Sequence, residues 1–196
     1  PFFAPDGAWI GFVTRTELKK ISVTGGSPIT LVTLDRSRGA SWGPDGTIVF
    51  APSVFSGLMR ISSYGGQAEP LTTLDKAKDE RTHRWPQVLP GGKALLYTSD
   101  TTASTEFYDD ARIDLWDMRA GTKKTIIEGG TSATYSTSGH IVYARAGKLM
   151  AVPFDVKRRE VTGTAFAVQD GIMMSRNTGA AHYTLSKRGD LAYVPG

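Results

Sequence analysis

Apolar and polar positions in this chain form a short pattern that recurs. In residues 41–50 it consists of Trp42, a tight turn at Pro44-Asp45-Gly46, and the apolar run Ile48-Val49-Phe50. Proline presets φ near about −65°, aspartate can hydrogen-bond its own downstream backbone, and glycine accepts a positive φ without steric cost. Because β-branched and aromatic side chains fit a pleated, buried surface, the pattern predicts two strands joined by a tight turn.

Copies of this hairpin pattern lie along the whole sequence. Successive turn glycines are separated by 39, 46, 47 and 50 residues, and they are Gly7, Gly46, Gly92, Gly139 and Gly189. A repeat of about 40 to 50 residues is typical of propeller blades, kelch units and helical repeat pairs. No window keeps apolar residues at the i, i+3, i+4 and i+7 positions of a helix, so the pattern excludes helical repeats.

The second half of each repeat predicts two more strands, such as residues 18–23 and 29–33 around Gly25-Gly26. Four strands per repeat make one blade of a β-propeller. We therefore expect an all-β fold, a β-propeller of four-stranded antiparallel blades with four complete blades and a half blade. The chain is treated as one domain, with blades at about 1–38, 39–84, 85–130, 131–180 and, in part, 181–196.

An incomplete ring would expose strand edges and the apolar faces of its first and last blades. The sequence therefore predicts either part of a ring of six or more blades, or a homodimer that covers the open edges.

Composition and charge narrow the class of protein. The 196 residues are 40% hydrophobic with 22 glycines and no cysteine, which suits a turn-rich globular domain, and no apolar run approaches the length of a membrane helix. We expect no direct membrane insertion, and the start at Pro1 suggests a cut rather than a natural N-terminus. The net charge is +4. The lysines and arginines are dispersed along the chain. This favours a role in keeping strand edges soluble over a role in binding nucleic acid.

The most charged stretch, residues 74–85, is expected to link the outer strand of the second blade to the inner strand of the third. Such a linker ends at the rim of the central channel, where loops on a rigid scaffold commonly bind ligands. His182 should lie near the axis by analogy. The candidate ligand-binding residues at this channel mouth are Glu80, Arg81, His83, Arg84, Trp85 and His182.

Two interpretations of this cluster stay open. In the functional one, two arginines and a titratable histidine form a pocket for an anion or a peptide carboxylate. In the structural one, which we favour, Glu80 pairs with Arg84, and His83 bonds a backbone carbonyl.

Two insertions carry further candidates. Residues 98–112 are too polar for a core and are expected to protrude; Asp100, Glu106, Asp109 and Asp110 could collect calcium, although their spacing favours a solvated acidic loop. Phe55, in the other insertion, is expected to pack over the neighbouring blade rather than to face a ligand.

Motifs for catalysis are absent from the sequence. It contains no Gly-x-Ser-x-Gly elbow, no Walker-type phosphate loop and no His-Glu-x-x-His zinc motif, so we expect no enzyme and no cofactor. His83 and His182 alone are too few for a stable zinc site.

The turn signatures at residues 3–7 and 42–46 resemble the repeat of TolB-like propellers. Residues 38–52, 83–92 and 189–196 resemble more narrowly the propeller that follows the kinase domain in many bacterial Ser/Thr kinases. The resemblance implies a non-catalytic sensing or protein-interaction module of a larger bacterial protein. Alternatives are a structural scaffold of an envelope complex, or the gating domain of a peptidase.

The resemblance also implies partners and a location. A protein or peptide partner, or a small anionic ligand, is expected, and no nucleic acid. The expected location is periplasmic or extracellular, with a cytoplasmic one left open.

Overall fold

Four antiparallel blades make up most of the computed structural model, which describes residues 1–102, 107–186 and 188–196. The first blade contains β1 (Phe2–Phe3), β2 (Trp9–Val13), β3 (Glu17–Ser22) and β4 (Ile29–Thr33). The second contains β5 (Ala40–Trp42), β6 (Thr47–Phe50), β7 (Met59–Ser62) and β8 (Glu69–Pro70). The third contains β9 (Glu80–Val88), β10 (Ala94–Thr101), β11 (Arg112–Asp117) and β12 (Thr122–Glu128). The fourth contains β13 (Thr131–Ser136), β14 (His140–Arg145), β15 (Lys148–Asp155), β16 (Glu160–Val161) and β17 (Phe166–Gln169).

Two small sheets follow the fourth blade. They pair β18 (Met174–Ser175) with β19 (Ala180–Ala181), and β20 (Tyr183–Leu185) with β21 (Leu191–Tyr193). The short 3-10 helix η1 (Lys76–Lys78) precedes β9. No helix among the described residues is long and apolar enough to cross a membrane. The predicted β-propeller of four-stranded blades, with a partial blade after them, is confirmed.

Apolar side chains on both faces of each blade hold the blades together. In β6, Ile48 and Phe50 join a cluster with the first blade, whereas Val49 joins another with Leu95 and Tyr97 of the third blade. All five are fully buried. A buried side chain of this size contributes about 1.5–3 kcal/mol, so a strand that is apolar on both faces is what packing between two blades requires.

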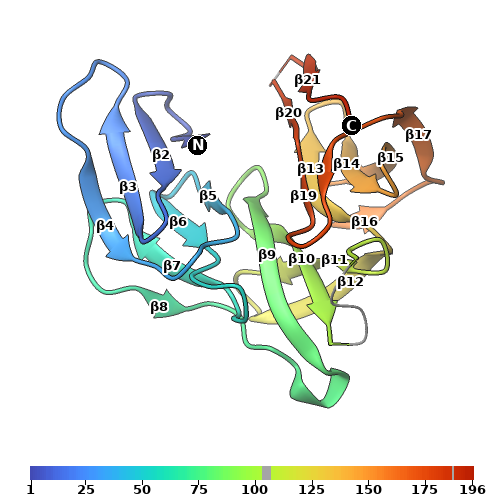
Figure 1. The fold of residues 1–196 in the computed structure, drawn as a ribbon, viewed down its shortest axis with the longest axis horizontal. Coiled ribbons are helices and arrows are strands. Elements are labelled where there is room, and N and C mark those ends of the chain that lie inside the picture. The colour runs from blue at the N-terminus through green and yellow to red at the C-terminus, as the bar shows by residue number, and fades with distance from the viewer. Residues whose placement is uncertain (103–106, 187) are drawn as a thin grey trace.

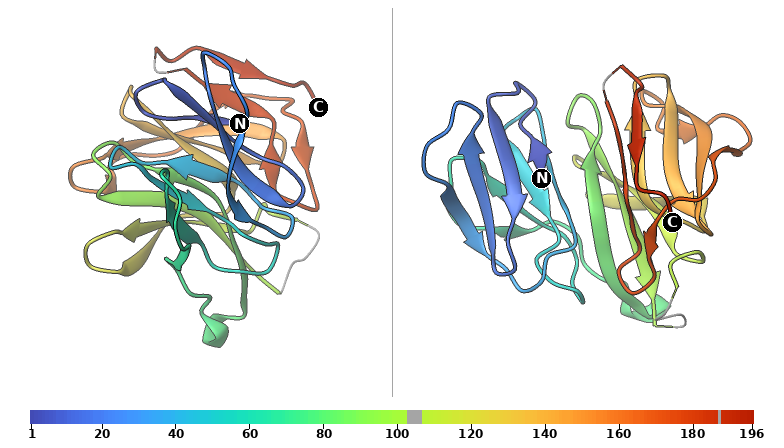
Figure 2. Two further views of the ribbon diagram at one scale, coloured as in Figure 1. Left: turned by 90° about the vertical axis from the view of Figure 1, so that its left-hand side faces the viewer. Right: turned by 45° about the horizontal axis from the view of Figure 1, so that its top comes forward.

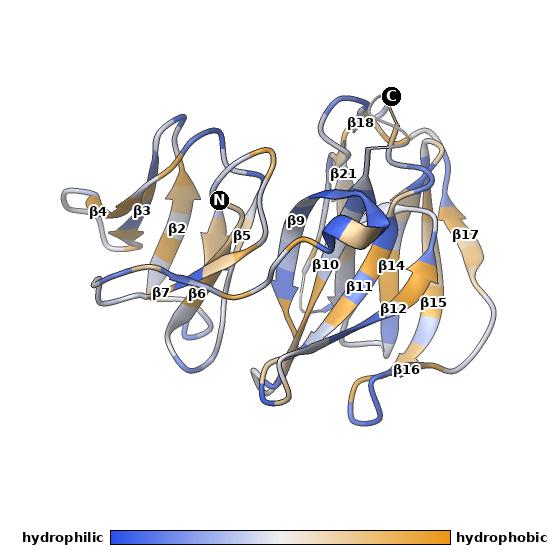
Figure 3. Cartoon of the chain, turned by 90° about the horizontal axis from the view of Figure 1, so that it is seen from below, coloured by the Kyte–Doolittle hydropathy of each residue, from blue (hydrophilic) through white to orange (hydrophobic). Residues whose placement is uncertain are grey.

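The innermost strands β1, β5, β9 and β13 each form the end of their own sheet. Figures 1 and 2 show β1–β8 on one side of β9 and the strands after β12 on the other, with both termini on the same side of the molecule. β17 is an exposed outer strand with apolar residues, coloured as hydrophobic in Figure 3; Phe166 is 50% exposed.

Two sequence expectations in the third blade are wrong. The end of the charged stretch is not a linker, because β9 already begins at Glu80. The polar insertion does not simply protrude, because β10 continues to Thr101 and Thr98, Ser99 and Asp100 are buried. Each of these polar side chains has a hydrogen-bond partner inside the molecule, which makes its burial tolerable.

In the insertion of the second blade, Phe55 is 68% exposed rather than packed over a neighbouring blade.

A residue with positive φ recurs at four places in the chain: just before β5, within β9, at the second residue of β13 and just before β19. The positions are separated by 46, 47 and 47 residues, and they are Gly39, Trp85, Ser132 and Gly179. In the second to fourth blades the left-handed turn glycine follows seven residues later. Only two of the four positions are glycine, so Trp85 and Ser132 hold a conformation that costs a non-glycine residue free energy.

Candidate functional site

Glu80, at the start of β9, is the centre of a buried ionic network. Its side chain is 1% exposed, and its Oε1 accepts hydrogen bonds from Lys123 and, at 3.0 Å, from Arg112. Its Oε2 accepts from the backbone N–H of Asp75 at 2.7 Å and lies 3.2 Å from His83 Nε2. Burial alone would raise the pKa of Glu80, but the bonds from His83, Lys123 and the Asp75 N–H outweigh it and lower the pKa to about 2.

His83 has both ring nitrogens occupied by protein groups. Nδ1 lies 2.8 Å from the Thr72 hydroxyl and Nε2 faces Glu80, while the ring packs 4.7 Å from that of Tyr97. His83 is 0% exposed. The favoured structural interpretation is therefore wrong in detail. Within the described chain Glu80 pairs with Arg112, Lys123 and His83 instead of Arg84, and His83 bonds a side-chain hydroxyl instead of a carbonyl.

Arg84 is a buried cation held mainly by carbonyl oxygens. It is 1% exposed; Nη1 donates to Thr178 O at 2.9 Å, Nη2 donates to Val54 O at 3.1 Å, and Nε donates to the Thr82 hydroxyl. Its guanidinium also lies 4.6 Å from the ring of Tyr108. Burial lowers the pKa of Arg84 to about 10. One side chain thus connects the second blade, the third blade and the turn between β18 and β19.

Arg81 and Asp100 form an ion pair next to Arg84. Arg81 Nε donates to Asp100 Oδ2 at 2.9 Å, and Nη2 donates to the hydroxyl of Tyr108. Burial raises the pKa of Asp100, and the nearby Arg81 opposes that shift.

The acidic residues considered for calcium do not form one cluster. Asp100 pairs with Arg81, while Asp109 Oδ1 accepts from the backbone N–H of Ala146 at 2.6 Å. Glu106 lies outside the described residues. Within residues 1–102, 107–186 and 188–196, no group of three or more His, Cys, Asp or Glu side chains is placed to hold a metal ion.

Trp85 and His182 complete the predicted set. Trp85 is half-buried, and its indole Nε1 donates to Thr178 O at 3.1 Å, the same oxygen that Arg84 bonds. His182 is exposed between β19 and β20, where its backbone bonds Met173 and Val194. Among the described contacts, none joins the His182 side chain to the other five candidates.

The left-handed residues take part in hydrogen bonds between blades. Trp85 N donates at 2.7 Å to the carbonyl oxygen of Arg38, in the connection between β4 and β5. The hydroxyls of Thr131 and Ser132 both donate to the carbonyl oxygen of Gly179. These bonds tie the inner strands together and account for the strained conformations.

The opposite ends of the same inner strands surround a large open cavity of about 880 Å³. Its walls come from all four blades and the β20–β21 sheet, and include Phe2, Trp42, Leu89, Tyr135 and Leu191. β1 and the β20–β21 hairpin line the same space from opposite ends of the chain. Asp190 is the one charged residue among the described residues that line it.

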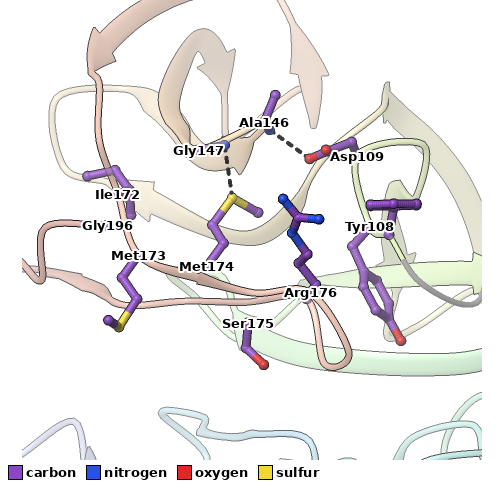
Figure 4. Close-up of a pocket in the computed structure, with 12 residues that line it drawn as sticks. Tyr108, Asp109, Ala146, Gly147, Ile172, Met173, Met174, Ser175, Arg176 and Gly196 are labelled. Carbon is purple, nitrogen blue, oxygen red and sulfur yellow. Dashed lines mark hydrogen bonds between the residues drawn. The ribbon is translucent and has the colours of Figure 1, made fainter.

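A second cavity, of about 440 Å³, is lined by residues 107–109, the turn at Ala146-Gly147 and residues 172–176 (Figure 4). Met174 and Arg176 extend between these segments; Met174 Sδ accepts from Gly147 N at 3.2 Å, and Arg176 packs over the ring of Phe107.

Several residues that shape these sites were not singled out from the sequence. Tyr108 and Thr178 contact the candidate arginines, and Phe2 and Tyr135 line the central cavity. The repeat spacing could have revealed the inner-strand positions, but it carries no signal for Tyr108, which lies in an insertion.

No family model matches this sequence, and no curated protein matches it. Solved structures match the fold at low sequence identity. TolB from Acinetobacter baumannii matches with a TM-score of 0.68 and 18% identity, over 100% of this chain and 51% of its own. Regucalcin, a calcium-binding protein from Agrobacterium tumefaciens, matches with a TM-score of 0.71 and 14% identity, over 97% of this chain and 64% of its own. An oligogalacturonate lyase in complex with manganese matches with a TM-score of 0.64 and 14% identity, over 95% of this chain and 58% of its own.

The chain thus spans between about half and two thirds of the length of these structures. The similarity shows the fold, so the TolB-like propeller indicated by the turn signatures is confirmed at the level of fold. The names of the matching structures include enzymes as well as TolB, so the fold does not decide between catalysis and binding.

Proposed function

We propose that the chain is a non-catalytic binding module of a larger bacterial protein, and that it holds an extended segment of a partner protein in the central cavity. The observation that carries the proposal is the convergence of the four blades and the β20–β21 sheet on one mostly apolar space of about 880 Å³. Pockets of this size that combine apolar walls with a few polar groups are typical binding sites.

The lining favours a peptide over a small anion. One carboxylate, Asp190, lines the cavity and no described lysine or arginine does, so the described lining offers an anion no counter-charge. The inner strand β1 ends its sheet, and its outer edge carries backbone groups that an extended peptide can pair with. Phe3 beside this edge is 65% exposed and offers an apolar contact.

The charged cluster has a supporting role in this proposal. Glu80, His83 and Arg84 are buried and bonded to protein groups, which holds the inner strands in place. Direct ligand binding by Glu80, Arg81, His83, Arg84, Trp85 and His182 stays a prediction. The absence of a Gly-x-Ser-x-Gly nucleophile motif supports the non-catalytic assignment, and the extracytoplasmic location implied by the TolB-like resemblance is part of the proposal.

A phage-displayed library of random dodecapeptides tests this function. Selected peptides are synthesised with a fluorescent label and titrated against the protein by anisotropy. Phe3→Arg and Ala192→Arg place a charge on opposite walls of the cavity at exposed positions, and each should weaken binding at least about tenfold. Phe55→Arg, exposed outside the cavity, is the matched control and should bind like wild type.

Three outcomes contradict the proposal. Peptides that bind both wall variants as tightly as wild type place the site elsewhere. A dimer in light scattering that Phe3→Arg dissociates makes a second copy the occupant. Two of the matching structures are an oligogalacturonate lyase and a puromycin hydrolase. Turnover of oligogalacturonate or puromycin by the purified chain therefore refutes the non-catalytic assignment.

A further inference from the structure

A buried lysine without an ionic partner lies between the first two blades. Lys20, on β3, is 8% exposed, yet it makes no ion pair or hydrogen bond through its ammonium to the described residues. Lysine is almost never buried to this extent unless it is paired. What surrounds its ammonium instead is aromatic: the nitrogen lies 4.4 Å from the centre of the Trp9 ring and 5.6 Å from that of Tyr64.

Lys20 lines a pocket of about 350 Å³ formed by the hairpin turns of these two blades. Trp9, Trp42 and Tyr64 supply aromatic walls, and Asp6 and Asp45 supply carboxylates. This pocket differs from the central cavity in its charged groups, because its lining includes one lysine and two aspartates. Tyr64 is 93% exposed, so one wall stands open to solvent.

The hydrogen-bonding capacity of the pocket is only partly used. The ammonium of Lys20 has three N–H donors and faces aromatic rings, which satisfy its charge in part but accept no strong hydrogen bond. Asp6 uses Oδ1 for the backbone N–H of Ala8, and Asp45 bonds Thr47, yet a carboxylate has about four acceptor sites. Donor and acceptor capacity are therefore available side by side, next to flat apolar faces.

We infer that this pocket binds a neutral sugar in its pyranose form. A pyranose presents an apolar C–H face that stacks on tryptophan or tyrosine, and hydroxyl groups that both donate to carboxylates and accept from an ammonium. Two carboxylates against one lysine leave the pocket net negative, which disfavours an acidic sugar. A cationic ligand is also disfavoured, because the ammonium of Lys20 already places a positive charge beside the rings of Trp9 and Tyr64. The volume lies at the lower end of the range for small-molecule sites and suits one ring.

The test titrates methyl β-D-glucopyranoside, methyl β-D-galactopyranoside and N-acetylglucosamine, with glucuronate and choline as charged comparisons. Saturation-transfer NMR detects binding, and tryptophan fluorescence gives the affinity because Trp9 and Trp42 line the pocket. We expect at least one neutral sugar to bind in the millimolar range. Lys20→Met and Tyr64→Ala should each weaken it about tenfold or more.

Lys19→Met is the matched control, because Lys19 lies next in the same strand but pairs with Glu17 outside the pocket. It should leave sugar binding unchanged. If Lys20→Met fails to fold, Tyr64→Ala decides, since so exposed a side chain contributes little to folding. Binding of none of the three neutral sugars, stronger binding of glucuronate or choline, or an unchanged affinity in Tyr64→Ala would overturn the inference.

Discussion

Arg84 and Thr178 lie 94 residues apart in the sequence, and the guanidinium Nη1 of Arg84 donates a 2.9 Å hydrogen bond to the carbonyl oxygen of Thr178. A second nitrogen of the same group bonds Val54 O. A buried arginine that bonds carbonyl oxygens has lost its hydration without gaining a counter-charge, so its hydrogen bonds must be complete. This relationship places Arg84 at the junction of three parts of the fold.

Replacing Arg84 by methionine should therefore destabilise the whole chain. The carbonyls of Val54 and Thr178 and the hydroxyl of Thr82 would lose their donor inside the protein, and we expect a loss of about 3 kcal/mol in the free energy of unfolding, measured by urea denaturation. Arg60→Met is the control, because Arg60 forms an exposed ion pair with Glu69 and should cost less than about 1 kcal/mol. Equal, small losses in both variants would show that Arg84 is not a structural junction.

Glu80 should make stability depend on pH in the acid range. Its pKa is about 2 in the folded protein, against an ordinary value of 4.5. Because the folded-state pKa is lowered, the stabilisation is complete above pH 4.5 and is lost as the pH falls from about 4.5 to about 2. Glu80→Gln should cost about 2–3 kcal/mol at pH 7 and flatten the stability profile in this window.

Denaturation curves recorded at pH 7, 5, 4 and 3 check this dependence. Glu69→Gln, at an exposed ion pair, provides the control and should keep the wild-type slope. A Glu80→Gln stability profile parallel to that of wild type would show that the buried network does not lower the pKa of Glu80.

Gly11 makes room for Phe2 at the edge of the central cavity. The two residues are opposite each other on β2 and β1, and a Cβ on Gly11 would lie 2.3 Å from the Phe2 ring. Gly11→Ala should therefore cost about 1–3 kcal/mol through overpacking. In a Phe2→Ala background the same change should cost much less, and a double-mutant cycle measures the difference. A cost that is the same in both backgrounds would place the strain elsewhere.

The outer strand β17 should limit solubility. Val168 is 49% exposed on this strand, where an unpaired apolar edge can template association. Val168→Lys should raise the temperature at which aggregation begins, with a change in stability below about 0.5 kcal/mol. Gln169→Lys adds the same charge without removing apolar surface. If it raises the aggregation temperature as much, net charge and not the edge is responsible.

The fold was predictable because it repeats. Turn glycines and apolar runs at intervals of 39 to 50 residues specify blades, and each blade needs little more than that pattern. The contacts of the charged cluster were not predictable, because they join distant positions: Lys123 reaches Glu80 across 43 residues.

Local reasoning also misled where polar residues were concerned. A pair between Glu80 and Arg84 was expected, but both lie in one extended strand, which separates such positions by about 13 Å. Thr98 and Ser99 were assigned to a protruding loop because they are polar, yet hydrogen bonds to Ser132 N and Asp114 let them lie in the interior.

The left-handed residues and the turn glycines limit how much extended backbone the inner strands present to the central cavity. From Gly39 to Gly46, from Trp85 to Gly92 and from Ser132 to Gly139 the interval is seven residues, and each end is fixed by a backbone conformation rather than by a side chain. Only three or four residues of each interval are extended, because β5 ends at Trp42, β9 at Val88 and β13 at Ser136, and they span roughly 10–13 Å. A partner segment that lies along one of these strands would therefore match three or four of its residues, which sets the shortest peptide worth testing.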